Sequence, residues 1–498
     1  METVITISRE YMGKRLYDVL LSMGISFFAP CGGNGTCGKC RVKLVSGRVR
    51  DAQGEWLAPD EKGEVLSCHA YIAEDCEVLI PEMSGAGLTV EASEDAEASA
   101  LGVALDIGTT TLAAALVDIG SGRVLKTASA LNPQGAFGAD VMSRITSARE
   151  GKLSLMQTVL IKTICGLFDE LLEGRESKVE ALTVVGNPTM LHLFLGISPE
   201  GIGQYPFTPA FLDTIYRTGA ELCLPCERVT LLPSASAFIG SDVVAGVYQL
   251  GLLKEKGVSL FLDVGTNGEI VLNKDGVLYA ASCAAGPALE GARISSGMGG
   301  VSGAVSSVEK KDGVYIYTTV NGTAARGVCG AGLCDLVARL LEDGVIDEGG
   351  YLDEDFRLVG CHKTENGIAK TAPTAVTLKA SDIREFQLAK AAIRAGLDTL
   401  LSVAGAQVSE LSSLSLAGGL GYYLSPDSAC RVGMFAPTLL PVIRAVGNTA
   451  LKGAIAALCH PEALSEIEWI AKAIKTVALN EHPEFSERFM EAMLFGDL

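Results

Sequence analysis

The stretch LDIGTTT at residues 105–111 recurs, in altered form, as LDVGTNG at residues 262–268. Each copy lies between two short apolar runs. Apolar runs on either side of a tight turn that contains glycine predict a β-hairpin, here with the turn sequence D-x-G-T. A repeat of this kind indicates a duplicated fold made of two related subdomains.

A hairpin turn of this composition can surround a phosphate chain with backbone N–H groups and hydroxyls. We expect Asp106 and Asp263 to face each other across a cleft, to hold Mg²⁺ through water, and to be the catalytic pair. Four other side chains of the turns are expected to contact phosphate: Thr109, Thr110, Thr266 and Asn267.

A third glycine-rich turn, AGGLG at residues 417–421, follows a short apolar run. Gly418, Gly419 and Gly421 would let an adenosine lie against the backbone. The two phosphate turns and this late glycine motif together resemble the superfamily of acetate kinase, sugar kinases, heat-shock ATPases and actin. The resemblance implies an actin-like or sugar-kinase-like ATPase over residues 101–498, divided at about residue 255. Three ordinary turns are the alternative.

Helix signals occupy the long segments between these turns. Apolar residues at helical spacing predict a helix over residues 157–172. A second helix is expected over residues 382–403, with Ser381 as its N-cap. A shorter, alanine-rich helix is expected over residues 449–458. Strands alternating with helices make the chain an α/β protein of several domains.

The N-terminal part contains CGGNGTCGKC at residues 31–40 and a further cysteine at position 68. Three thiolates from one glycine-rich loop and a fourth from a distant turn are typical of a [2Fe–2S] site. Five residues separate the first two cysteines, whereas plant ferredoxins have four at this position. The spacing of five resembles that of adrenodoxin-like proteins. A zinc site or a disulfide is the alternative, although zinc favours paired C-x2-C units. The expected cluster ligands are Cys31, Cys37, Cys40 and Cys68.

Strands are expected near residues 4–8, 40–45 and 77–80, with a helix over residues 16–23. This is the β-grasp order of ferredoxins, so residues 1–81 are predicted to form a ferredoxin domain. Residues 82–100 are small and acidic, which predicts a flexible linker, with a surface loop as the alternative.

Composition excludes some partners. The net charge of -19 argues against nucleic acid and against an anionic membrane surface. No apolar run is long enough to span a bilayer. Fourteen cysteines without a secretory leader predict a reducing cytoplasmic location, where clustered cysteines bind metal or carry out redox chemistry.

A ferredoxin domain joined to an actin-like ATPase resembles the reductive activators of corrinoid-dependent methyltransferases. Longer members of that family carry an extra segment between the two parts, where this chain has only about twenty residues. Further strings match the family: NPQGAFGADV at 132–141, GNPTMLH at 186–192, CAAGPALEG at 283–291, RGVCGAG at 326–332 and GN at 447–448.

The resemblance implies an ATP-dependent enzyme that reduces an inactive Co(II) corrinoid protein to Co(I), one electron at a time, from its [2Fe–2S] cluster. It implies a corrinoid protein and a low-potential electron donor as partners, with a homodimer as one option. Gly186 and Asn187 would lie in a hinge near the phosphates. Residues 290–300 (EGARISSGMGG) would face the partner, with Ser295 and Ser296 approaching cobalt, and a plain glycine-rich turn is the equal alternative.

Two other functions stay open on the sequence. One is an ATP-gated electron donor to another acceptor, such as an acyl-CoA dehydratase. The activators of those enzymes typically hold a [4Fe–4S] cluster between two subunits and have no ferredoxin domain, so the N-terminal cysteines argue against this function. The other is a non-catalytic ferredoxin fused to a nucleotide-sensing module.

Overall fold

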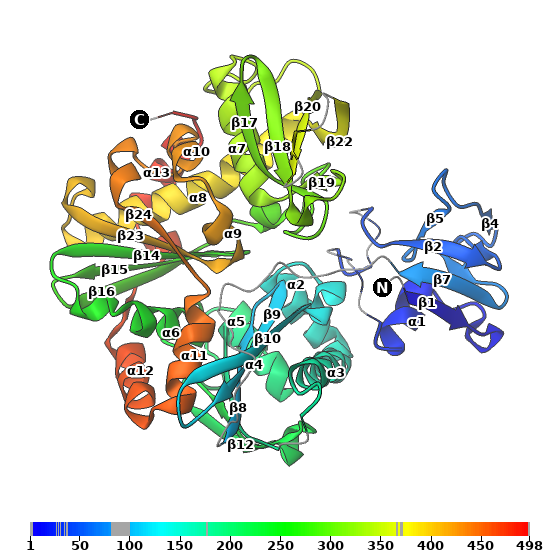
Figure 1. Cartoon of the computed structure of the whole chain (residues 1–498), viewed down its shortest axis with the longest axis horizontal. Coiled ribbons are helices and arrows are strands. Elements are labelled where there is room, and N and C mark those ends of the chain that lie inside the picture. The colour runs from blue at the N-terminus through cyan, green and yellow to red at the C-terminus, as the bar shows by residue number, and fades with distance from the viewer. Residues whose placement is uncertain are drawn as a thin grey trace.

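A computed structural model describes residues 3–80, except 26, 28, 30, 34, 36 and 37, and residues 100–496, except 176–177, 365–366 and 369–371. The N-terminal part lies beside two larger α/β lobes (Figure 1). The expected linker over residues 82–100 falls outside the described residues, apart from residue 100.

The N-terminal part is built on a four-stranded antiparallel sheet with the order β1-β7-β2-β5. Helix α1 (Leu16–Ser22) buries its apolar face against this sheet. The strands are β1 (Thr3–Ile7), β2 (Arg41–Ser46), β5 (Glu64–Leu66) and β7 (Cys76–Ile80). A second sheet has the order β4-β3-β6, formed by β3 (Val49–Arg50), β4 (Trp56–Leu57) and β6 (Tyr71–Ile72). Each expected N-terminal element is present within two residues of its expected bounds.

The first lobe contains a six-stranded sheet with the order β10-β9-β8-β11-β13-β12. Central strand β8 runs antiparallel to β9 and parallel to β11, where Ile107 pairs with Gly186. The turn of the β8–β9 hairpin and the end of β11 therefore lie at the same edge of the sheet. The strands are β8 (Leu101–Ile107), β9 (Thr111–Asp118), β10 (Arg123–Leu131), β11 (Val179–Gly186), β12 (Ile215–Thr218) and β13 (Cys226–Leu231).

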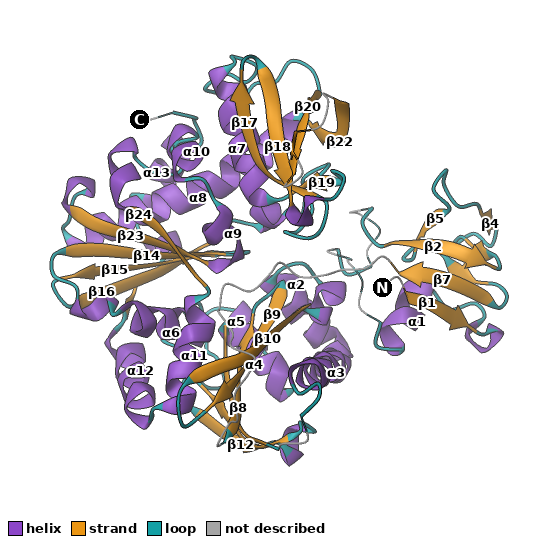
Figure 2. Ribbon diagram, viewed as in Figure 1, coloured by secondary structure: helices purple, strands orange, loops and turns teal. Residues whose placement is uncertain are grey.

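The second lobe repeats this arrangement with the strand order β24-β23-β14-β15-β16-β25. Strand β14 runs antiparallel to β15 and parallel to β23, so the duplication read from the repeated turns is confirmed. Both central strands are almost wholly buried, because helices cover both faces of each sheet (Figure 2). The strands are β14 (Val258–Val264), β15 (Gly268–Lys274), β16 (Val277–Cys283), β23 (Leu411–Ala417), β24 (Ile443–Gly447) and β25 (Lys475–Thr476).

Two of the three expected helices need correction. Helix α3 (Leu153–Leu171) begins one turn before residue 157. Helix α8 (Ala380–Ala404) begins before Ser381, so the prediction that Ser381 is its N-cap is wrong. Lys379 is the N-cap residue, and its backbone N–H donates to Asp382 Oδ2 at 2.9 Å. The third helix, α11 (Thr449–Cys459), is confirmed, and it packs against α6 (Ser241–Leu250) between the two sheets.

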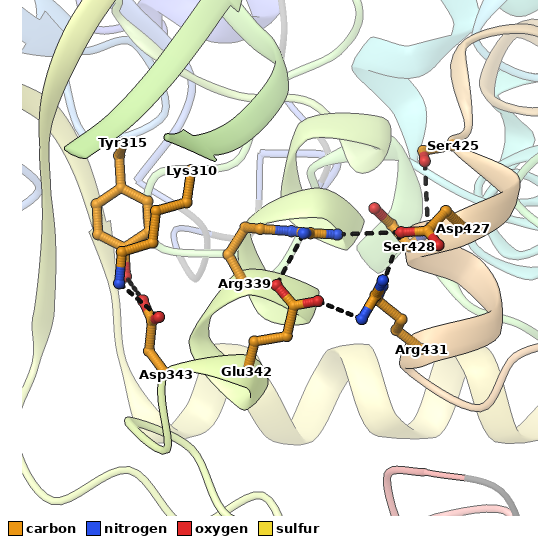
Figure 3. A network of polar contacts seen from close by, with 9 residues as sticks. All are labelled: Lys310, Tyr315, Arg339, Glu342, Asp343, Ser425, Asp427, Ser428 and Arg431. Carbon is orange, nitrogen blue, oxygen red and sulfur yellow. Dashed lines mark hydrogen bonds and ion pairs between the residues drawn. The ribbon is translucent and has the colours of Figure 1, made fainter. Parts of the chain in front are cut away.

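The second lobe also carries a smaller sheet that the sequence did not reveal, built on β17 (Ala304–Lys311), β18 (Val314–Thr319) and β20 (Phe356–Thr364). Helix α7 (Gly330–Glu342) packs on it and is tied to α10 (Pro426–Arg431) by ion pairs (Figure 3). Shorter strands of this sheet are β19 (Gly327–Val328), β21 (Gly367–Ile368) and β22 (Ala372–Leu378).

The remaining helices pack around and within the two lobes. In the described ranges, no helix combines the length and the apolar character needed to cross a membrane. These helices are α2 (Val141–Ser147), α4 (Pro188–Leu195), α5 (Glu200–Gly203), α9 (Gly418–Tyr423), α12 (Pro461–Ala473) and α13 (Phe485–Glu491).

Candidate nucleotide cleft and cysteine loop

The turns of the two hairpins line one cleft between the lobes, together with the start of α9. Gly418 has φ +80°, and a Cβ there would lie 2.4 Å from Asp263 Oδ1, so only glycine fits this position. Gly421 lies further along α9, where a Cβ would lie 3.2 Å from the carbonyl carbon of Leu416. The cleft lining brings together nine of the expected site residues, and Gly186 and Gly421 lie just outside it. The nine are Asp106, Thr109, Thr110, Asn187, Asp263, Thr266, Asn267, Gly418 and Gly419.

Five carboxylates line this cleft: Asp106 and Asp263, two that the sequence did not reveal, and Glu290, which is described below. Burial raises the pKa of Asp106 to about 8 and that of Asp263 to about 7. The two further carboxylates are Asp242, at the start of α6, whose pKa burial raises to about 6, and Glu269 on β15, whose pKa is also raised by burial. Only the tertiary fold brings Asp242 to the cleft, whereas Glu269 directly follows the second turn and pairs with Asp263 in the β14–β15 hairpin, so its place beside the repeated turn could have signalled it.

This concentration of buried negative charge fits a bound divalent cation, which would stabilise the ionised carboxylates. Mg²⁺ prefers oxygen ligands and is commonly held by one or two carboxylates together with substrate phosphates. Asp106 Oδ2 is oriented by the side-chain amide of Asn448, which donates to it at 2.8 Å. Asp106 and Asp263 are therefore suitable residues for holding Mg²⁺ with a nucleotide.

Gly186 and Asn187 lie next to the first turn, at the end of β11. A Cβ at Gly186 would lie 2.8 Å from the carbonyl oxygen of Ile107, so the strands approach closely here. The Asn187 side chain donates to Thr109 Oγ1 at 3.1 Å and accepts from the backbone N–H of Met190 at 3.0 Å. Asn187 thus caps α4 and at the same time orients a hydroxyl of the phosphate turn.

Glu290, the first residue of the segment expected to face a partner, connects the two phosphate turns. Its Oε1 accepts from Thr110 Oγ1 at 2.8 Å, and its Oε2 accepts from Thr266 Oγ1 at 2.5 Å. Arg144, fully buried, donates to the carbonyl oxygens of Thr109 at 2.6 Å and Gly138 at 3.0 Å. Burial raises the pKa of Glu290, while the two hydroxyls and the Arg144 charge oppose that rise.

The end of the cysteine loop and the turn after β5 bring two of the expected ligands together at the base of β2. Cys40 and Cys68 are buried, and their sulfur atoms lie 3.2 Å apart, well beyond the ~2.05 Å of a disulfide. Cys31 is half-buried in the same loop, and Cys37 lies outside the described residues. At Gly35, with φ +75°, a Cβ would lie 2.5 Å from the His69 ring, so the loop wraps closely. The converging thiols and the tight loop fit a [2Fe–2S] cluster.

The N-terminal part contacts both lobes, through the cysteine loop and through helix α1. Lys39 Nζ donates to the carbonyl oxygens of Gly297 at 3.1 Å and of Ile294 and Ser295 at 3.4 Å. On the other side, Tyr17 Oη donates to the carbonyl oxygen of Ala136 in the first lobe. The N-terminal part therefore bridges the first lobe and the 294–297 turn of the second.

Ser295 and Ser296, expected to face a corrinoid, lie in this turn with their hydroxyls engaged within the protein. Ser295 donates from its backbone N–H and its hydroxyl to Asp382 Oδ1, at 2.8 and 3.1 Å. Ser296 Oγ accepts from the backbone N–H of Thr377 at 2.9 Å and donates to the carbonyl oxygen of Ala375 at 3.3 Å. Contact with a partner would require these hydroxyls to exchange hydrogen bonds.

Three family models match successive parts of the chain. A 2Fe-2S iron-sulfur cluster binding domain matches residues 7–73, the RACo middle region matches residues 101–255, and the C-terminal domain of RACo, the ASKHA domain, matches residues 257–497.

Similar proteins match across most of their length. The chain is 33% identical over 434 residues to the corrinoid activation enzyme RamQ of Eubacterium limosum, covering 81% of this chain and 72% of that protein. It is 27% identical over 415 residues to the [Co(II) methylated amine-specific corrinoid protein] reductase of Methanosarcina barkeri, covering 75% and 72%. A solved reductive activator for corrinoid,iron-sulfur protein superposes with a TM-score of 0.71 at 28% identity, over 99% of this chain and 97% of that one.

Proposed function

Because the chain belongs to the RACo family of corrinoid activators, we propose that it uses ATP to reduce a Co(II) corrinoid protein to the Co(I) state. One observation carries the proposal. A single short segment of the second lobe, residues 290–297, contacts both phosphate turns through Glu290 and the cysteine loop through the carbonyl oxygens that accept from Lys39. A nucleotide in the cleft and an electron carrier in the loop are thus joined by one segment.

The energetics explain why ATP would be needed. Plant-type [2Fe–2S] centres have potentials near about −400 mV, and a corrinoid Co(II)/Co(I) couple lies lower. Each 100 mV of one-electron deficit costs about 2.3 kcal/mol. ATP can help only if the protein binds the nucleotide, or the corrinoid protein, differently in two conformations.

The position of each residue suggests its role in the proposed reaction. The cluster held by Cys31, Cys37, Cys40 and Cys68 would supply one-electron transfer. Asp106 and Asp263 would hold Mg²⁺, and Gly418 and Gly419 would accept the adenosine. The phosphate contacts would come from Thr109, Thr110, Thr266, Asn267 and Asn187.

The partners follow from the same reading. The corrinoid protein would approach the 294–297 turn, and a low-potential donor would recharge the cysteine loop. For Ser295 to reach cobalt, its hydroxyl would have to leave Asp382, which makes the Ser295 contact conditional on a movement of the turn. A homodimer is compatible with this scheme and is not required by it.

The experiment mixes the cluster-loaded protein with a Co(II) corrinoid protein of a methyltransferase system, MgATP and a strong reductant. We expect the Co(I) absorption band to appear with ATP and not with a non-hydrolysable analogue. Absence of any ATP-dependent Co(I) formation would refute the activator function. Stoichiometric reduction without ATP would favour a plain ferredoxin with a nucleotide-sensing module.

A further inference from the structure

Glu290 occupies a position that no other carboxylate shares among the described residues of the cleft. It alone accepts hydroxyl hydrogen bonds from both phosphate turns, from Thr110 at 2.8 Å and from Thr266 at 2.5 Å. The two turns come from different lobes, so its oxygens mark the place where both phosphate-binding elements meet. The terminal phosphate of a bound nucleotide would lie next to this place.

The hydrogen-bond inventory restricts what Glu290 can do there. An ionised carboxylate only accepts hydrogen bonds, so it cannot bind a phosphate oxygen, which also only accepts. Each threonine hydroxyl has one proton, so Thr110 and Thr266 cannot donate to Glu290 and to a phosphate at the same time. When the phosphate takes these protons, the Glu290 oxygens need a new donor, and a water molecule between Glu290 and the phosphate supplies it.

The other carboxylates of the cleft are fixed differently. Asp106 is held by the Asn448 amide, and Glu269 accepts from Ser282 Oγ at 3.2 Å. Asp242 accepts from the backbone N–H of Val243 at 2.9 Å, in the first turn of α6. None of these three carboxylates accepts a hydroxyl of either phosphate turn, and Asp263 is already assigned to Mg²⁺ together with Asp106. Glu290 accepts from both turns, which makes it the carboxylate best placed to face an attacking water.

We propose that Glu290 is a catalytic residue of ATP hydrolysis, which orients the attacking water and accepts one of its protons. The water oxygen forms a bond to the γ-phosphorus, the bond from that phosphorus to the β,γ-bridging oxygen breaks, and ADP leaves with the electron pair. The proton taken by Glu290 passes to solvent or to the released phosphate. This inference rests on the proposed ATPase function and assigns a residue to it.

Arg144 supports this arrangement from behind the first turn. Its guanidinium group holds the carbonyl oxygens of Thr109 and Gly138, so the turn that carries Thr110 has little freedom to move. A fixed turn keeps the nucleotide and the water in register with Glu290, which is the positional requirement of general base catalysis.

The test compares the cluster-loaded wild type with Glu290→Gln and Glu290→Asp. Glutamine keeps the size and one acceptor oxygen but cannot accept the proton, whereas aspartate keeps the carboxylate and withdraws it from the water. Glu468→Gln is the matched control, because Glu468 Oε1 also accepts a threonine hydroxyl, from Thr214 at 2.6 Å, on α12 outside the cleft lining. Phosphate release from MgATP, affinity for a non-hydrolysable ATP analogue and thermal midpoint are measured for each.

A general base contributes about 10²–10⁴-fold to a rate. We therefore expect Glu290→Gln to lower phosphate release by at least about a hundredfold, with analogue affinity within about threefold of wild type and an unchanged thermal midpoint. Glu290→Asp should retain more activity than Glu290→Gln. A purely structural role would instead lower the midpoint or the analogue affinity in parallel with the rate, and that result would overturn the proposal.

The outcomes for the wild type separate this inference from the proposed function. If the wild type binds the analogue and hydrolyses ATP while Glu290→Gln keeps a third or more of the rate, the inference fails and the ATPase function stands. If the wild type neither binds the analogue nor releases phosphate, with or without a Co(II) corrinoid protein, the ATPase function itself fails, and the inference falls with it.

Discussion

Replacing Lys39 with methionine tests whether the cysteine loop is held on the ATPase part by the contact seen here. Lys39 lies between two of the expected cluster ligands, and its ammonium group donates to three carbonyl oxygens of the 294–297 turn. Methionine keeps most of the side-chain volume and removes the charge and all three donors. We expect the N-terminal part to leave the turn more often.

The distances set the size of the effect. Hydrogen bonds that involve a charged group contribute about 1.5–3 kcal/mol. Only the 3.1 Å bond to Gly297 lies within the usual N–H···O range, the other two are 3.4 Å, and the ammonium group is partly exposed. The lower value, about 1.5 kcal/mol, is therefore appropriate, and it corresponds to about a tenfold fall in the ratio of docked to undocked molecules.

Hydrogen–deuterium exchange measures the docked state at both contacts, in peptides that cover residues 133–138 and 294–298. Lys39→Met should raise exchange in both, because the same domain covers both. Lys43→Met is the control. It removes the same charge from an exposed position on β2 of the same domain. Equal cluster absorbance in all samples excludes damage to the loop. Unchanged exchange in both peptides would refute the docking argument.

Three further perturbations test other parts of the molecule. Cys68→Ser should abolish the cluster absorption and leave binding of a non-hydrolysable ATP analogue intact, since the cysteine lies outside the nucleotide cleft. Gly418→Ala should weaken analogue binding at least about tenfold, because its Cβ would lie 2.4 Å from Asp263 Oδ1 at φ +80°, and calorimetry with folded protein would show it. Lys390 is fully buried, and burial lowers the pKa of its ammonium group from 10.5 to about 7. Between pH 7 and 10.5 the unfolded chain therefore binds more protons than the folded protein, so the free energy of unfolding rises with pH by up to about 1.4 kcal/mol per pH unit. Lys390→Met should remove this slope when unfolding in urea is measured across that pH range. An equal slope in both proteins would contradict the lowered pKa of Lys390.

The sequence predicted the features that depend on short segments. The two D-x-G-T turns each form within one hairpin, and the cluster loop needs only ten consecutive residues and Cys68. Local pattern therefore identified the duplicated lobes, the ferredoxin part and most of the cleft lining. The N-cap of α8 is a local feature that was nevertheless predicted wrongly. The cap is Lys379 and not Ser381, and the Asp382 side chain, rather than a serine hydroxyl, accepts the hydrogen bond at this helix end.

The features that the sequence did not predict join segments far apart in the chain. Glu290 meets Thr110 across 180 positions, and Lys39 meets Gly297 across 258. Asp242 reaches the cleft only because α6 packs between the two sheets. No periodicity or spacing in a single sequence encodes such pairs, since they depend on how the lobes and the N-terminal part are placed together.

The placement of these pairs makes a last prediction about linkage. Glu290 and the 294–297 turn are separated by three residues, and the intervening chain is tightly packed: a Cβ at Gly291 would lie 2.4 Å from the backbone of Met298. The packed chain between them cannot easily absorb a shift of Glu290. A shift of Glu290 on nucleotide binding is therefore expected to move the carbonyl oxygens that hold Lys39. If nucleotide binding changes docking by some factor, docking must change nucleotide affinity by the same factor. Lys39→Met should thus shift the Kd of a non-hydrolysable ATP analogue by up to about tenfold, the size of its docking effect, while Lys43→Met leaves it unchanged. If exchange shows that Lys39→Met frees the domain and the Kd stays at the wild-type value, the nucleotide cleft and the cysteine loop are not coupled through this segment.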